Sequence, residues 1–177
     1  LEFRRVLFRS GVSKGLTYDI FNYYSNISGI KLGKFVIPNP FGPFEEPRFT
    51  TYLIKSWFDS KIPQINTPDY VRDNIHISLL SKAYVKFLVK VLKSSSTLTR
   101  FNPSGYVESQ GNFAKRCATE MGKRLSMPCK VKNNRQNDFL EPLERYNSDK
   151  LLPSEYQWNE AQAWDDLCDY YRKYLLP

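Results

Sequence analysis

Apolar residues follow two periods that alternate along this chain, and this alternation constrains the fold more than any other feature. Between residues 12 and 27, apolar side chains recur every three or four positions, as on one face of a helix. Residues 30–37 form a short, mostly apolar run that ends in a proline- and glycine-rich turn through Pro43, which is typical of a buried strand. Because helix-like and strand-like segments go on alternating along the chain, we expect an α/β fold.

The rest of the chain extends this pattern, and we find no internal repeat. Further helices are expected over residues 47–58, 78–92, 110–125 and 158–175. Further strands are expected over residues 71–77, 97–101 and 129–132, with a turn over residues 102–105 and a polar loop over residues 133–138. The glycine-rich strand–turn–helix that opens a dinucleotide-binding domain does not occur in this sequence.

Composition restricts the class of protein. With 177 residues, of which 41% are hydrophobic, the chain is long enough to fold around a core of its own. Its formal net charge of +8 fits a binder of anionic nucleotide diphosphates, and it fits a basic nucleic-acid-binding module as well. The aromatic residues stand at helix-core spacing rather than in clusters beside Arg and Lys, so we expect no nucleic-acid partner. A structural module without chemistry stays open as a further alternative.

Cysteine usage and hydropathy bear on the cellular location. Cys117, Cys129 and Cys168 are widely separated and the chain has a single histidine, so we expect no metal site. Unpaired thiols indicate a reducing compartment, and we expect a cytoplasmic protein. No apolar run approaches the ~18 residues that a membrane-spanning helix needs, so no membrane partner is expected.

Three short motifs resemble those of a known family. They are residues 11–14 (Gly-Val-Ser-Lys), residues 37–43 (Ile-Pro-Asn-Pro-Phe-Gly-Pro) and residues 71–77 (Val-Arg-Asp-Asn-Ile-His-Ile). Together they resemble the active-site helix, the following strand and the Arg-Asp-x-Ile-His-Val element of the extended short-chain dehydrogenase/reductases. These enzymes are NAD-dependent epimerases and dehydratases that act on sugar nucleotides.

The resemblance covers nearly all of residues 11–177 and implies a truncated Rossmann-like fold, the second half of the dinucleotide-binding fold with an interleaved small substrate-binding region. Residues 11–104 would form the second half of the nucleotide-binding domain with substrate-binding insertions. Residues 105–177 would form a C-terminal substrate-binding region that ends in a helix. Residues 1–10 contain three arginines and neither an initiator methionine nor a small-residue cleavage site. We expect them to be a non-native segment or a disordered arm.

The catalytic signature of the family is Tyr-x-x-x-Lys. In the family, the lysine ammonium favours the tyrosine phenolate, whose free pKa is near ~10, and it hydrogen-bonds the nicotinamide ribose. The resemblance therefore implies that Lys14 is a catalytic and cofactor-binding residue. The partner tyrosine is absent, because Ser10 stands at its position.

The resemblance also implies roles for four residues outside that helix. Pro40 would approach the nicotinamide through its backbone, and Asn39 would contact the phosphate or the sugar of the substrate. Arg72 would bind the substrate diphosphate, because a guanidinium presents paired donors that a lysine cannot match. Arg145, in a looser match, would bind the same diphosphate. His76 is expected to be a packed, hydrogen-bonded histidine rather than a general base.

The implied function is that of a fragment of an NAD(P)-dependent epimerase/dehydratase, which acts on a nucleotide-diphosphate sugar by transient hydride transfer. A sugar-nucleotide reductase of the same family is the alternative. NAD or NADP is implied as the cofactor, and the resemblance allows a homodimer of the intact parent protein. Because the chain has neither a glycine-rich turn nor the catalytic tyrosine, we expect it to be inactive by itself.

Overall fold

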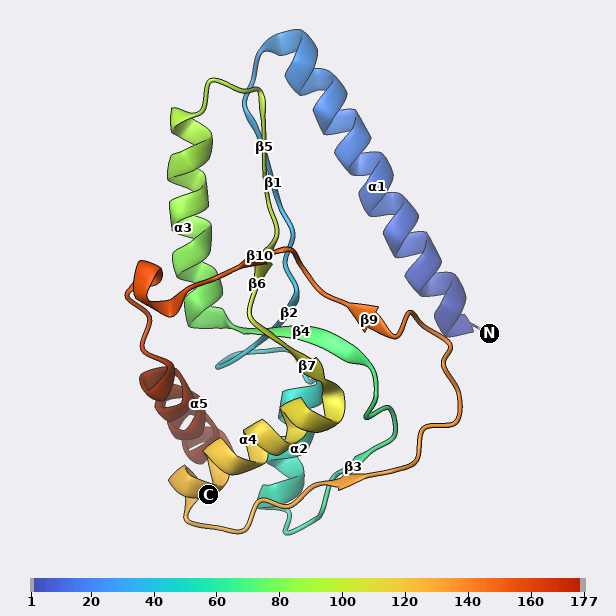
Figure 1. Cartoon of the computed structure of the whole chain (residues 1–177), viewed down its shortest axis with the longest axis vertical. Coiled ribbons are helices and arrows are strands. Elements are labelled where there is room, and N and C mark those ends of the chain that lie inside the picture. The colour runs from blue at the N-terminus through green and yellow to red at the C-terminus, as the bar shows by residue number, and fades with distance from the viewer. Residues whose placement is uncertain (1, 176–177) are drawn as a thin grey trace. The chain divides into compact units, whose positions relative to one another are not determined.

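The computed structural model describes the backbone of residues 2–175 and the side chains of residues 11–175 (Figure 1). The chain divides into two compact units. One contains the residues up to Phe35 together with Tyr84–Phe101, and the other contains Val36–Ala83 together with the residues from Asn102 onward. Helices and parallel strand pairs occur in both, so the expected α/β class is confirmed.

The first unit is built from α1 (Glu2–Ser28), β1 (Leu32–Phe35), the later part of α3 (Ile77–Lys93) and β5 (Leu98–Phe101). Strands β1 and β5 pair in parallel, with Leu32 opposite Leu98. The ring of Phe35 packs against that of Phe87 on α3, with 5.2 Å between the ring centroids. Gly33 faces the same helix, where an added Cβ would lie 3.0 Å from the Phe87 ring. This close approach explains why β1 carries a glycine there.

Helix α1 differs from its expected extent and packing. It was expected over residues 12–27, whereas the structure has it from Glu2 to Ser28, where Gly29 in a left-handed conformation (φ +69°) ends it. Apolar side chains on its expected buried face, such as Leu16 at 60% exposure, are exposed. The side chains of residues 1–10 lie outside the described residues, so the expectation that this segment does not pack stays a prediction.

The second unit contains a four-stranded sheet around β4 (Val71–His76). Strands β2 (Asn39–Phe41) and β9 (Glu144–Arg145) pair with β4 in parallel, and β7 (Tyr106–Ser109) pairs with it antiparallel. Three helices, α2 (Phe49–Phe58), α4 (Gln110–Leu125) and α5 (Glu160–Leu175), supply most of the core of this unit.

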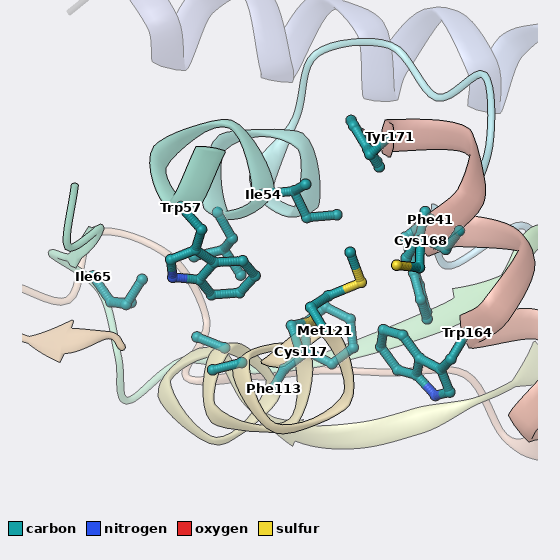
Figure 2. Packing of buried hydrophobic residues seen from close by; sticks show 14 residues of the cluster. Phe41, Ile54, Trp57, Ile65, Phe113, Cys117, Met121, Trp164, Cys168 and Tyr171 are labelled. Atoms are coloured by element: carbon teal, nitrogen blue, oxygen red, sulfur yellow. The ribbon is translucent and has the colours of Figure 1, made fainter. Parts of the chain in front are cut away.

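The core of the second unit is rich in large side chains from these helices (Figure 2). The Phe41 ring on β2 lies 5.2 Å from the Phe113 ring and 5.3 Å from the Trp164 ring, measured between centroids. Trp57 on α2 is 2% exposed and donates its indole N–H to the Lys130 carbonyl oxygen over 2.8 Å. These aromatic residues therefore belong to the core of the second unit, whereas others, such as Phe44 and Tyr174, are exposed.

Several short elements were missed or misplaced. Residues 102–105 were expected to form a turn, but Pro103–Ser104 is a strand (β6) that pairs with β10 (Asp149–Lys150). The strand expected over residues 129–132 is β8 (Lys132–Asn133), which pairs with β3 (Gln64–Ile65). Each of these strands depends on a partner far away in the sequence, which a local pattern cannot show. A 3-10 helix (Pro153–Tyr156) precedes α5. No described helix is both long and apolar enough to cross a membrane.

Candidate functional site

A cavity of ≈ 260 Å³ in the second unit gathers most of the residues that the sequence nominated. Asn39, Pro40, Arg72 and Arg145 all line it, so four predicted ligand residues share one space. They come from three strands of the same sheet, β2, β4 and β9. Further lining residues that the sequence analysis did not nominate are Phe41, Glu45, Arg48, Phe49, Thr50, Thr67, Tyr70, Asn74, Gln110 and Glu141.

Strand register explains how these side chains come together. Asn39 on β2 lies opposite Asn74 on β4, and Arg145 on β9 lies opposite Arg72 on β4. Arg72 and Asn74 are two residues apart on one strand, so their side chains leave the sheet on the same face. One face of the sheet formed by β4 and its parallel neighbours β2 and β9 therefore lines the cavity. It supplies the guanidiniums of Arg72 and Arg145 and the carboxamides of Asn39 and Asn74.

Arg72 is held rigidly at the wall of this cavity. The side chain is 3% exposed, and its Nη2 donates to Glu141 Oε2 over 3.0 Å. Its Nη1 donates to the backbone carbonyl oxygens of Val71 (2.8 Å), Pro142 and Leu143 (both 3.2 Å). These partners fix the plane of the guanidinium and compensate the cost of burying its charge.

Glu141 links the two cavity arginines. Its Oε2 lies 3.0 Å from Arg72 Nη2 and 3.8 Å from Arg145 Nη1, so one carboxylate serves two guanidiniums. This end of the cavity therefore carries an excess of positive charge, which favours an anionic ligand. The sequence offered a weak signal for Glu141, which stands four residues before Arg145.

Asp73 holds the backbone around the site. Its Oδ1 accepts a hydrogen bond from the Gly105 amide over 2.8 Å, and its Oδ2 accepts one from the Asn147 amide over 3.1 Å. An added Cβ on Gly105 would lie 2.4 Å from the Asn74 carbonyl oxygen, so only glycine allows this approach. Asp73 is 1% exposed and each of its carboxylate oxygens accepts a hydrogen bond from a backbone amide, so its role here is structural.

His76 is packed and hydrogen-bonded, as its place in an apolar strand predicted. It is 2% exposed, and burial lowers its pKa to about 4, although the charge of Asp166 opposes the shift. The Ser78 amide lies 3.2 Å from His76 Nδ1 and donates to it, and the Ser78 hydroxyl lies 2.7 Å from the same nitrogen. The Trp158 indole N–H in turn donates to the Ser78 hydroxyl oxygen over 2.8 Å. Because Nδ1 accepts the amide hydrogen bond, the proton of the neutral ring is on Nε2.

Glu45 is a half-buried acid that lines the same cavity. Burial raises its pKa, although hydrogen bonds from Thr51, Gly42 and Tyr171 oppose the shift. The Thr51 hydroxyl donates to Glu45 Oε1 over 2.7 Å, and the Gly42 amide donates to Oε2 over 3.3 Å. Glu45 therefore contributes an acceptor to the cavity, and no motif in the sequence singled it out.

The remaining nominated residues lie in the first unit. Lys14 is on α1 and its side chain is exposed, so its catalytic role stays a prediction. The side chain of Ser10 lies outside the described residues. Among the residues that the structure does describe, no group of three or more His, Cys, Asp and Glu side chains is placed to hold a metal ion.

Comparisons with solved structures place this fold among known ones. The chain matches the UDP-N-acetylglucosamine 4-epimerase of Methanobrevibacter ruminantium in complex with UDP-N-acetylmuramic acid, with a TM-score of 0.62 and 12% identity. It matches the UDP-glucose 4-epimerase of Thermotoga maritima with a TM-score of 0.67 and 14% identity. A variant of the UDP-glucuronic acid 4-epimerase of Bacillus cereus, in complex with a UDP-sugar and NAD, gives a TM-score of 0.64 and 17% identity.

These matches cover most of this chain but only part of each neighbour. They cover 88%, 93% and 93% of this chain, in the same order, and 50%, 53% and 52% of the other chains. The chain thus spans about half the length of the solved structures it matches. No protein-family model and no curated protein sequence matches it. The chain has a partial Rossmann-like fold of the kind found in the UDP-sugar 4-epimerases.

Proposed function

We propose that this chain is the nucleotide-sugar-binding part of an NAD-dependent UDP-sugar epimerase. The observation that carries the proposal is the cavity in which Arg72 and Arg145, two arginines bridged by Glu141, stand beside Asn39 and Pro40. Two guanidiniums at one end of a cavity suit a diphosphate, because each offers planar paired donors to phosphate oxygens. The three solved structures reported above are UDP-sugar 4-epimerases, which favours epimerisation over reduction.

Each residue then has a definite task. Arg72 and Arg145 bind the diphosphate, and the anion takes over part of the charge compensation that Glu141 supplies to both. Asn39 donates to the phosphate or the sugar, and Pro40 borders the cofactor side of the cavity. In a protein with a tyrosine at position 10, Lys14 would favour the phenolate that removes the sugar hydroxyl proton. Ser10 cannot act as this base, so the chain as it stands lacks the tyrosine that would remove the sugar hydroxyl proton.

NAD supplies the hydride chemistry of this proposed reaction, but the described residues do not form its main anchor. Pyrophosphate binding needs a glycine-rich turn between a strand and a helix. The two described glycines with positive φ, Gly29 and Gly42, stand singly and precede no such helix. We therefore assign to this chain only Lys14 and Pro40 as cofactor contacts.

Two further proposals concern the cellular location and the oligomeric state. The three free cysteines favour a cytoplasmic protein. For the longer enzyme we propose a homodimer.

The test is calorimetric titration of the chain with UDP-glucose. Arg72→Lys should weaken binding by roughly 10- to 100-fold, since a charge-assisted contact contributes about 1.5–3 kcal/mol. Arg116→Lys is a matched control outside the cavity. Arg116 also pairs with a carboxylate, that of Glu108 at 2.6 Å, and lies over a tyrosine ring at 4.6 Å, as Arg72 lies over Tyr70 at 4.5 Å. Equal affinity of the wild type and Arg72→Lys would refute the assignment of the diphosphate to this cavity.

A further inference from the structure

Asn74 carries a buried carboxamide that folding leaves unpaired. The residue is 8% exposed, and its Nδ2 is buried without a hydrogen-bond partner. Buried polar groups in proteins are nearly always paired, because an unpaired donor loses its water without compensation. Such a group is a reason to look for a ligand.

The position of Asn74 sets it apart from the other unpaired group. Among the side chains that the structure describes, His76 Nε2 is the second buried atom without a partner, and His76 does not line the cavity. Asn74 does line it, together with Arg72 and Arg145. It stands two residues after Arg72 on the same face of β4 and opposite Asn39 on β2.

We propose that Asn74 is a further ligand-binding residue, whose carboxamide donates a hydrogen bond to an oxygen of the nucleotide sugar next to the Arg72 site. The proposal rests on the function proposed above. A primary amide has two N–H donors, and the chemistry that satisfies them is an acceptor oxygen of a phosphate or a sugar hydroxyl. The adjacent guanidiniums favour a ligand that carries such oxygens with negative charge nearby.

This arrangement also predicts selectivity. A ligand without an acceptor oxygen at this place would leave the amide unpaired in the complex, and a site built to pair a polar group discriminates strongly against such ligands. The neighbouring carboxamide of Asn39 lies in register with Asn74 on the adjacent strand. The two amides together would therefore bind adjacent oxygens of one ligand.

The experiment replaces Asn74 with leucine, which is close in size and has no polar atoms. We expect Asn74→Leu to weaken binding of UDP-glucose by about tenfold, the usual loss for one hydrogen bond in a site. We also expect an unchanged or higher melting temperature, because the variant removes a buried donor that had no partner. A residue with a merely structural role would show the opposite pattern, lower stability with unchanged affinity.

Asn134→Leu is the matched control. Its Nδ2 donates to Gln64 Oε1 over 3.1 Å and to Asn66 Oδ1 over 2.8 Å, and it does not line the cavity. This variant should lose stability and keep its affinity for UDP-glucose. Should Asn74→Leu fail to fold, Asn74→Ala removes the same amide without adding a branched side chain and makes the same comparison.

Titration with UDP alone locates the contact. Equal weakening for UDP and UDP-glucose places Asn74 on the UDP portion, and weakening for UDP-glucose only places it on the glucose; both results support the proposal. If Asn74→Leu bound both ligands as tightly as the wild type does, the role of Asn74 would be refuted. The proposed function would stand in that case, because the wild type binds the ligands. A wild-type chain that is folded and binds neither ligand would overturn the proposed function and this inference with it.

Discussion

Mild acidification should destabilise this protein through its only histidine. His76 is 2% exposed, and burial lowers its pKa from 6.5 to about 4. Between these two values the unfolded chain binds a proton that the folded chain does not bind, so stability falls as the pH falls. With these pKa values, linkage predicts a loss of about 1.3 kcal/mol between about pH 7.5 and about pH 5.5. Most carboxylates stay ionised over this range in the unfolded chain, so the histidine dominates the change.

The assay is urea unfolding at the two pH values, followed by tryptophan fluorescence, with His76→Asn as the control. Asparagine keeps an acceptor for the Ser78 donors and does not titrate. Glu45 has the opposite effect on stability. Because burial raises its pKa, the folded chain binds a proton there more readily than the unfolded chain, so this group alone would increase stability as the pH falls. Both proteins contain Glu45, so its effect cancels in their difference. The same pH dependence in the wild type and in His76→Asn would refute the view that burial keeps His76 neutral.

Three other perturbations have definite expected outcomes. Glu141→Gln should strengthen UDP binding in calorimetric titration, because it removes the carboxylate that competes for the two cavity arginines; weaker binding would show that this carboxylate positions them instead. Gly105→Ala should lower the free energy of unfolding in urea by more than about 2 kcal/mol, since its Cβ would lie 2.4 Å from the Asn74 carbonyl oxygen. Cys117 and Cys168 should react with a thiol reagent only after denaturation, because burial raises the pKa of both thiols; rapid labelling of the native protein would contradict their burial.

Local sequence patterns were sufficient for the helices after α1 and for part of the site. The 3-4 apolar spacing predicted α4 and α5 close to their observed ends, because helix formation depends on neighbours within one turn. The motif over residues 71–77 nominated Arg72, and the structure places this residue in the cavity with Asn39, Pro40 and Arg145. The roles of these residues toward a ligand stay predictions.

The sequence by itself determined the α/β class, the principal helices and the chemical types that the cavity carries. Only the tertiary structure decided that residues 103–104, within the expected turn, form the strand β6, because short strands form through partners that are remote in sequence. It also decided that Glu141 shares its carboxylate between Arg72 and Arg145, and that Asn74 is left unpaired beside them. Charge sharing and hydrogen-bond satisfaction depend on which atoms come within about 3 Å of one another, and that proximity arises only when distant segments pack.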